Sequence, residues 1–80
     1  MNPIYVPKKR RPLSHVKEGE KVTVMEVNGG RGINLRLCEL GIAIGSTMTV
    51  IQNSGGPVIV SYGGCRMALG KGVSSKIMVE

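Results

Sequence analysis

The stretch LRLCELGIAIGSTMTV, residues 35–50, combines the end of a helix, a tight turn and the start of a strand. Ile33, Leu37 and Leu40 stand four and three residues apart, a spacing that places them on one face of a helix. The pattern predicts a short helix over residues 33–40. Since two turns of helix are unstable alone, this apolar face must pack against the rest of the fold.

Two glycines shape the chain after this helix. Gly41 follows the last apolar position directly and suits the left-handed conformation that ends many helices. Gly45 then turns the chain into a run rich in Thr, Val and Ile over residues 46–52, which predicts a strand. We therefore assign structural roles to Leu37 and Leu40, which seat the helix, and to both glycines.

Further strands are predicted at short intervals, separated by glycine-rich turns such as NGGRG at 28–32 and the Gly63-Gly64 pair. The predicted strands cover residues 21–27, 46–52, 57–62, 65–69 and 77–79. About five short antiparallel strands with one short helix indicate a small, strongly bent all-β barrel.

The chain has 80 residues and a formal net charge of +6, which is unevenly distributed. Residues 1–12 contain four basic side chains, no acidic ones and three of the four prolines. Proline resists both helix and sheet, so we predict a basic, flexible arm over 1–12 and one folded domain over 13–80. The domain is nearly balanced in charge, which makes a nucleic-acid partner a weak expectation.

Catalytic and metal-binding groups are scarce. The chain has one histidine, no aspartate and no base beside a nucleophile, so we predict that it is not an enzyme. His15, Cys38 and Cys65 are the soft metal ligands, and none is near another in sequence. We predict that the chain holds no cofactor and that both thiols are partly buried. A weak transition-metal site, or one shared between two molecules, stays open.

The cysteines and the hydropathy pattern indicate in which cell compartment the protein works. Two cysteines outside a CxxC motif favour free thiols in a reducing environment. No apolar run is long enough to cross a membrane, and residues 1–12 lack the apolar core of a signal peptide. We therefore expect a cytoplasmic protein with no direct membrane insertion.

Taken together, the motifs resemble those of ferrous iron transport protein A, the FeoA family. The resemblance covers residues 12–80, and its most specific piece is Arg-Leu-x-Glu-Leu-Gly at 36–41. Weaker pieces are Leu13-Ser14, Gly19-Glu20, Gly45, Gly56-Pro57, Ala68-Leu69-Gly70 and the closing Ile-x-Val at 77–79. Ile44 departs from the pattern, since the family often has proline there.

The resemblance implies an SH3-like barrel and a role in ferrous iron uptake. The expected partner is FeoB, a membrane permease with a cytoplasmic GTP-binding domain, and FeoA would act as its accessory or regulator. The family is also linked to transition-metal ions. The residues themselves support a binding module without an intrinsic iron site.

A partner surface is predicted on the outward side of the helix. Residues on a helix advance by about 100° each, so Leu35 lies roughly 160° from Leu37. Leu35 should therefore point to solvent between Arg36 and Glu39, as an apolar side chain surrounded by charge. This arrangement is typical of a docking site, although a lone exposed leucine is also common.

Two other functions remain open at this stage. GEKVTVMEVNGGRGI, residues 19–33, is similar to the KOW pattern of RNA-binding SH3-like modules, and the basic arm adds to that reading. The chain also resembles a detached C-terminal SH3-like domain of metal-dependent repressors. No helix-turn-helix precedes the barrel here, so such a domain would not repress alone.

Overall fold

The computed structural model describes residues 9–80, which form a sheet of short strands with two short α-helices and one 3₁₀ turn. In chain order the elements are β1 (Arg11–Pro12), η1 (Leu13–His15), β2 (Lys21–Val27), α1 (Gly30–Glu39), β3 (Thr47–Gln52), β4 (Val58–Tyr62), β5 (Cys65–Leu69), α2 (Lys71–Ser74) and β6 (Ile77–Val79).

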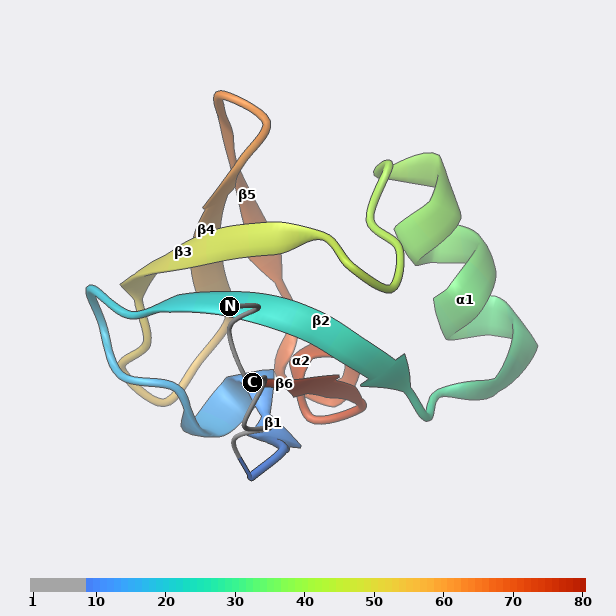
Figure 1. The fold of residues 1–80 in the computed structure, drawn as a ribbon, viewed down its shortest axis with the longest axis horizontal. Helices are drawn as coiled ribbons and strands as arrows, with labels where there is room; N and C mark the ends of the chain where they lie inside the picture. The colour runs from blue at the N-terminus through green and yellow to red at the C-terminus, as the bar shows by residue number, and fades with distance from the viewer. Residues whose placement is uncertain (1–8) are drawn as a thin grey trace, which may run out of the picture.

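All neighbouring strands are antiparallel, in the order β1-β6-β2-β3-β4-β5. The long strand β2 belongs to both halves of the sheet, because β6 pairs with it on one side and β3 on the other. Figure 1 shows the sheet bending around β2 with α1 standing at the end where β2 finishes. The predicted small barrel with its five strands is confirmed, and a sixth strand is added.

The sixth strand, β1, corrects the predicted start of the domain. Arg11 pairs with Val79 and Pro12 with Met78, so both residues belong to the sheet and not to a flexible arm. The Arg11 guanidinium also donates hydrogen bonds of 3.1 and 2.9 Å to the two carboxylate oxygens of Glu20. The predicted boundary at residue 13 was two residues late, and residues 1–8 of the arm lie outside the described part of the chain.

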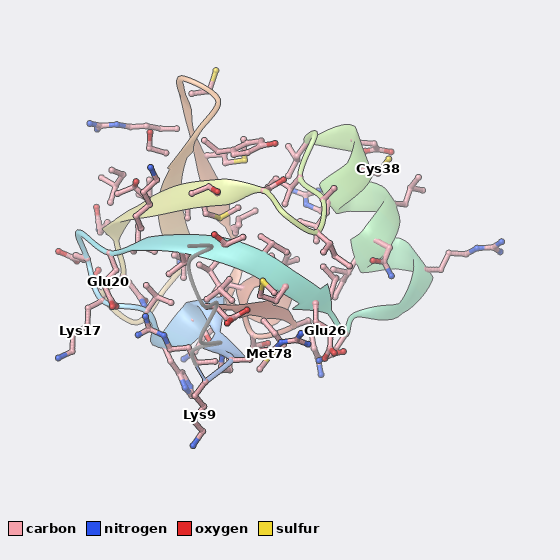
Figure 2. All side chains as sticks on the ribbon, viewed as in Figure 1. Lys9, Lys17, Glu20, Glu26, Cys38 and Met78 are labelled. Atoms are coloured by element: carbon pink, nitrogen blue, oxygen red, sulfur yellow. The ribbon has the colours of Figure 1, made fainter. Side chains whose placement is uncertain are left out.

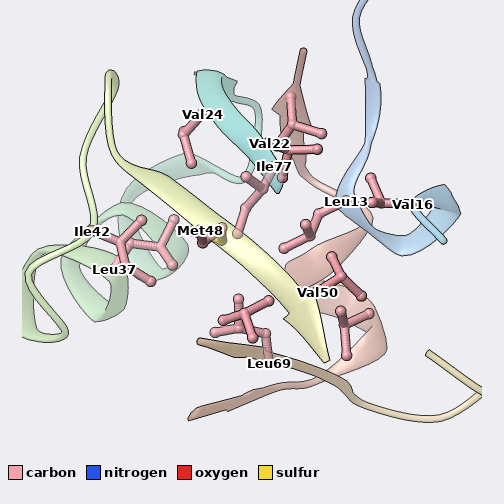
Figure 3. Packing of buried hydrophobic residues seen from close by; sticks show 13 residues of the cluster. Leu13, Val16, Val22, Val24, Leu37, Ile42, Met48, Val50, Leu69 and Ile77 are labelled. Carbon is pink, nitrogen blue, oxygen red and sulfur yellow. The ribbon is translucent and has the colours of Figure 1, made fainter. Parts of the chain in front are cut away.

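The core is built from alternating side chains of the strands, with leucines from η1 and α1 filling its ends. In β2, for example, Val22 and Val24 are buried while Lys21 is exposed, which is the period of two expected for a strand with one face to the core. Leu37 and Ile42 lie side by side where α1 meets this core (Figure 3).

Helix α1 begins earlier than predicted but faces the predicted way. It starts at Gly30, so three of the five residues of the NGGRG segment that was assigned to a turn are helical. Leu37 is buried, and Ile33 and Leu40 pack against the core, as the apolar spacing indicates. The exposed fraction of Leu35 is 60%, which confirms that this side chain points to solvent.

The end of α1 is a Schellman motif centred on Gly41. The Gly41 N–H donates to the carbonyl of Cys38 at 3.0 Å, and the Ile42 N–H donates to the carbonyl of Leu37 at 2.8 Å. Gly41 has a φ of 77°, and Gly45 in the next turn has a φ of 96°, so both predicted structural glycines occupy left-handed positions. The motif brings Ile42 onto Leu37 and ends the helix at the edge of the core.

Candidate docking face beside helix α1

An open apolar pocket of about 560 Å³ lies between the C-terminal half of α1 and the loop that leads to β3. It is lined by Val27, Asn34, Leu37, Cys38, Gly41, Ile42, Ala43 and Ile44. Only Asn34 and Cys38 contribute polar side chains, so the pocket offers apolar surface and no acid–base pair. Such a surface suits an apolar side chain of a partner.

The loop wall of the pocket is held in place by hydrogen bonds from β4. The Tyr62 hydroxyl donates to the carbonyl of Gly41 at 2.7 Å and lies 3.2 Å from the Ser46 hydroxyl. The Ser46 hydroxyl in turn accepts a hydrogen bond from the Ala43 N–H at 2.9 Å. These contacts fix both ends of the loop, so the pocket is set by the tertiary fold and not by the helix alone.

Two large apolar side chains stand exposed in this region: Ile44, which lines the pocket, and Leu35 on helix α1. The exposed fraction is 69% for Ile44 and 60% for Leu35, which are the two exposed large apolar side chains within residues 9–80. Cys38, which lines the pocket, is also exposed and comes three residues after Leu35, so the two are surface neighbours on the helix. We call Leu35, Cys38, Ile44 and the pocket the docking face.

The charged side chains beside Leu35 differ in part from the predicted ones. Arg36 and Glu39 are both exposed, as predicted. With an advance of about 100° per residue, however, Leu35 lies between Arg31 and Glu39, and Arg36 falls on the flank away from Cys38. The sequence predicted the exposure of Leu35, Arg36 and Glu39, and their role in partner binding stays a prediction, while the pocket and Ile44 were not predicted. The signal for Ile44 was its departure from the family pattern.

The thiols are more exposed than the sequence suggested. Both Cys38 and Cys65 are free and exposed, so the prediction of partly buried thiols was wrong. Cys38 lies near the C-terminal end of α1 (Figure 2), and Cys65 starts β5. Among residues 9–80, no group of three His, Cys, Asp or Glu side chains is placed to hold a metal ion.

Much of the positive charge near the N-terminal end of the described chain is neutralised within the fold. Arg11 pairs with Glu20 at 2.9 Å, and Arg10 lies 3.4 Å from Glu26; the two glutamates are labelled in Figure 2. The hydrogen bond from Arg11, followed by the one from the Lys17 N–H, holds the pKa of Glu20 below its usual value. These pairings leave less free charge for a phosphate backbone and do not favour the RNA-binding reading.

No helix within residues 9–80 is long and apolar enough to cross a membrane.

The fold defines this chain as an SH3-like barrel domain with an apolar pocket beside its helix. The model of the FeoA domain matches residues 11–80, and the chain therefore belongs to the FeoA family. It is 49% identical over 69 residues to the Methanocaldococcus jannaschii protein named "Putative Fe(2+) transport protein A", covering 86% of this chain and 84% of that protein.

Solved structures agree with this assignment. The crystal structure of an iron uptake regulatory protein, FeoA, superposes with a TM-score of 0.82 at 37% identity, covering 91% of this chain and 97% of that one. A manganese-dependent transcriptional repressor in complex with manganese gives a TM-score of 0.84 at 20% identity, over 92% of this chain but only 37% of the repressor. The second likeness is one of fold alone.

Proposed function

We propose that this FeoA-family chain is a non-enzymatic, cytoplasmic accessory module of ferrous iron uptake. It acts by docking on the cytoplasmic GTP-binding domain of a FeoB-like permease. Family membership supports the pathway. The docking face beside α1 supports the mode of action, and the exposure of Leu35 and Ile44 around an apolar pocket is the observation that carries it.

The physical reason is the energetic cost of leaving this surface in water. Side chains of the size of leucine and isoleucine lose about 1.5–3 kcal/mol of favourable burial when they remain exposed. Here Ile44 lines a pocket that is already apolar and already shaped by Tyr62 and Ser46, and Leu35 lies about one helical turn from Cys38 of the same lining. A partner that fills the pocket gains this burial without having to order the loop first.

The chemistry of the docking face favours binding over catalysis. Its side chains are aliphatic apart from one amide and one thiol, and no carboxylate or imidazole lines it. Glu39 and Arg31 stand at the outer edge of Leu35, where charged groups set orientation and association rate more than affinity. We assign the contact itself to Leu35 and Ile44, and orientation to Arg31 and Glu39.

The proposal is tested by introducing a charged side chain on the docking face and measuring the affinity for the partner. We expect Leu35→Asp to weaken binding to the purified GTP-binding domain of the FeoB-type permease from the same organism by about 1 kcal/mol or more, about fivefold in affinity. The thermal stability of the chain should change little, because the side chain is 60% exposed. Ile44→Asp should act in the same direction. Binding is measured by isothermal titration calorimetry.

Gln52→Asp is the matched control, since it adds the same charge at the exposed end of β3 remote from α1. It should leave binding unchanged. Unaltered affinity in both Leu35→Asp and Ile44→Asp would move the docking site elsewhere. Unfolding of Leu35→Asp would instead contradict the orientation of α1.

A further inference from the structure

Strand β5 forms an open edge of the sheet. It pairs with β4 alone, and it stands last in the strand order among residues 9–80. Three of its five residues are exposed, namely Cys65, Arg66 and Ala68. The turn that joins it to β4 projects away from the rest of the sheet (Figure 1), while Leu69 at the other end of the strand is buried.

The register determines which backbone groups point outward from this edge. Tyr62 pairs with Cys65 across the Gly63-Gly64 turn, which makes this a hydrogen-bonded pair of a tight hairpin. Hydrogen-bonded and non-hydrogen-bonded pairs alternate along antiparallel strands. The N–H and C=O groups of Arg66 and Ala68 therefore face away from β4, ready to pair with another strand.

Sheet edges are normally protected against such pairing, and the two edges of this sheet differ. At the other edge, β1 is only two residues long and ends in Pro12, which has no N–H, next to Arg11. β5 has no proline and no lysine, and its register with β4 runs through five pairs without a bulge. The sheet has bulges elsewhere, between β2 and β6 and between β3 and β4.

We propose that β5 pairs antiparallel with β5 of a second copy of this chain, about a twofold axis at Met67. In this register Arg66 faces Ala68 of the second copy, and by symmetry Ala68 faces Arg66. Both residues present their backbone groups outward, so the two symmetric pairs complete four backbone hydrogen bonds. The inference goes beyond the docking of the permease, because it concerns the sheet edge and not the face beside α1.

The side chains fit this self-pairing. Arg66 is the one charged residue of β5 and meets a small alanine, so the twofold places no like charges directly opposite. On the other face of the strand, Met67 meets its symmetry mate and Cys65 meets Leu69. No pair across the axis thus places two charged side chains opposite one another. An edge strand from another protein would not repeat each of these pairs on both sides of a twofold axis.

The net charge of each copy sets how the dimer responds to salt. With +6 on each chain, the two copies repel one another at low ionic strength, and added salt screens this repulsion. Only five residues of each chain enter the pairing, so we expect a weak dimer that forms at high protein concentration. Analytical ultracentrifugation of the full chain over a concentration series measures its dissociation constant.

The first test removes one outward hydrogen-bond donor. Ala68→Pro deletes the N–H that points to the second copy without removing a bond to β4, and it should raise the dimer dissociation constant about tenfold or more. Ala68→Thr is the matched control, since it keeps the N–H and suits a strand, and its constant should stay near that of the parent. Circular dichroism confirms that both variants fold.

The second test uses charge to identify the partner strand. Ala68→Glu would face Arg66 of the second copy in both symmetric pairs, and Ala68→Lys would place like charges there. We expect the glutamate to tighten the dimer and the lysine to weaken it, each by about threefold or more. Equal responses to the two variants would contradict the register. A chain that stays monomeric at millimolar concentration and high salt, or an Ala68→Pro dimer as tight as the parent, would overturn the proposal.

Discussion

At the scale of single residues, Gly41 decides where α1 ends and where the docking face begins. Its positive φ allows the two hydrogen bonds of the Schellman motif, which fold Ile42 back onto Leu37. Its carbonyl also accepts the hydrogen bond from Tyr62. A β-carbon at Gly41 would meet no atom within 4 Å, so the need for glycine here comes from the backbone conformation and not from crowding.

We expect Gly41→Val to destabilise the chain by about 1 kcal/mol or more, because a β-branched residue is poorly accommodated in the left-handed region. Urea unfolding of parent and variant measures the difference. Gly41→Asn serves as the control, since asparagine tolerates this conformation better and should cost less. Equal stability of the valine variant and the parent would mean that the helix end readily adopts another conformation.

At the scale of elements, ion pairs and side-chain hydrogen bonds attach the short N-terminal pieces to the sheet. β1 contributes two residues to the strand pairing and is secured by the bidentate contact between Arg11 and Glu20. η1 is secured by Asn53, whose side-chain amide donates to the carbonyls of Ser14 and Val16 at 2.9 and 2.8 Å. The contacts of Asn53 join segments 37 and 39 positions apart in the sequence.

The Arg11–Glu20 contact makes part of the stability depend on pH. The Arg11 hydrogen bond, followed by that of the Lys17 N–H, lowers the pKa of Glu20 in the folded chain. The contact therefore contributes fully to stability at pH values above the pKa that Glu20 has in the unfolded chain. It is lost as the pH falls through the lower pKa of the folded chain. We therefore expect Glu20→Gln to be less stable than the parent at neutral pH, and the two to converge in acid.

Thermal unfolding between neutral pH and about pH 3 checks this expectation, since the window lies around and below the ordinary glutamate pKa. Glu39→Gln is the control, because Glu39 is exposed on α1 and forms no ion pair within residues 9–80. It should follow the parent at every pH. A constant gap between Glu20→Gln and the parent down to the lowest pH would show that the carboxylate charge is not what secures β1.

At the scale of the whole molecule, the barrel separates its soft metal ligands. His15 lies in η1, Cys38 near the end of α1 and Cys65 at the start of β5, and no group of three possible metal ligands forms among residues 9–80. A stable zinc or iron site usually needs at least three good ligands in one place. Each of the three residues lies on a different element and has an exposed side chain.

We accordingly expect no submicromolar site for Fe²⁺ or Zn²⁺ at one ion per chain in the monomer. Titration of the purified chain under reducing, anaerobic conditions measures this directly. Binding at that strength, lost in Cys38→Ser or in Cys65→Ser, would show that the ligands come together in a way the fold does not display. A weaker site that appears only with dimerisation would point to ligands supplied by two copies.

The sequence alone predicted the five main strands, the inward face of α1 and its end at Gly41. Each of these rests on local patterns: alternation along strands, spacing of Ile33, Leu37 and Leu40, and a glycine at a left-handed position. The solvent exposure of Leu35 followed from the same helical period. These features were predictable because neighbours in sequence are enough to determine them.

Only the tertiary structure decided the rest. β1 exists because Arg11 and Pro12 pair with β6, the last strand of the chain, and no local pattern carries that information. The pocket exists because Tyr62 of β4 holds the carbonyl of Gly41, a contact between residues 21 positions apart in the sequence. Ile44 lies on the loop that this contact holds, so its place in the docking face depends on the same pairing of distant segments, which the spacing of neighbouring residues does not contain.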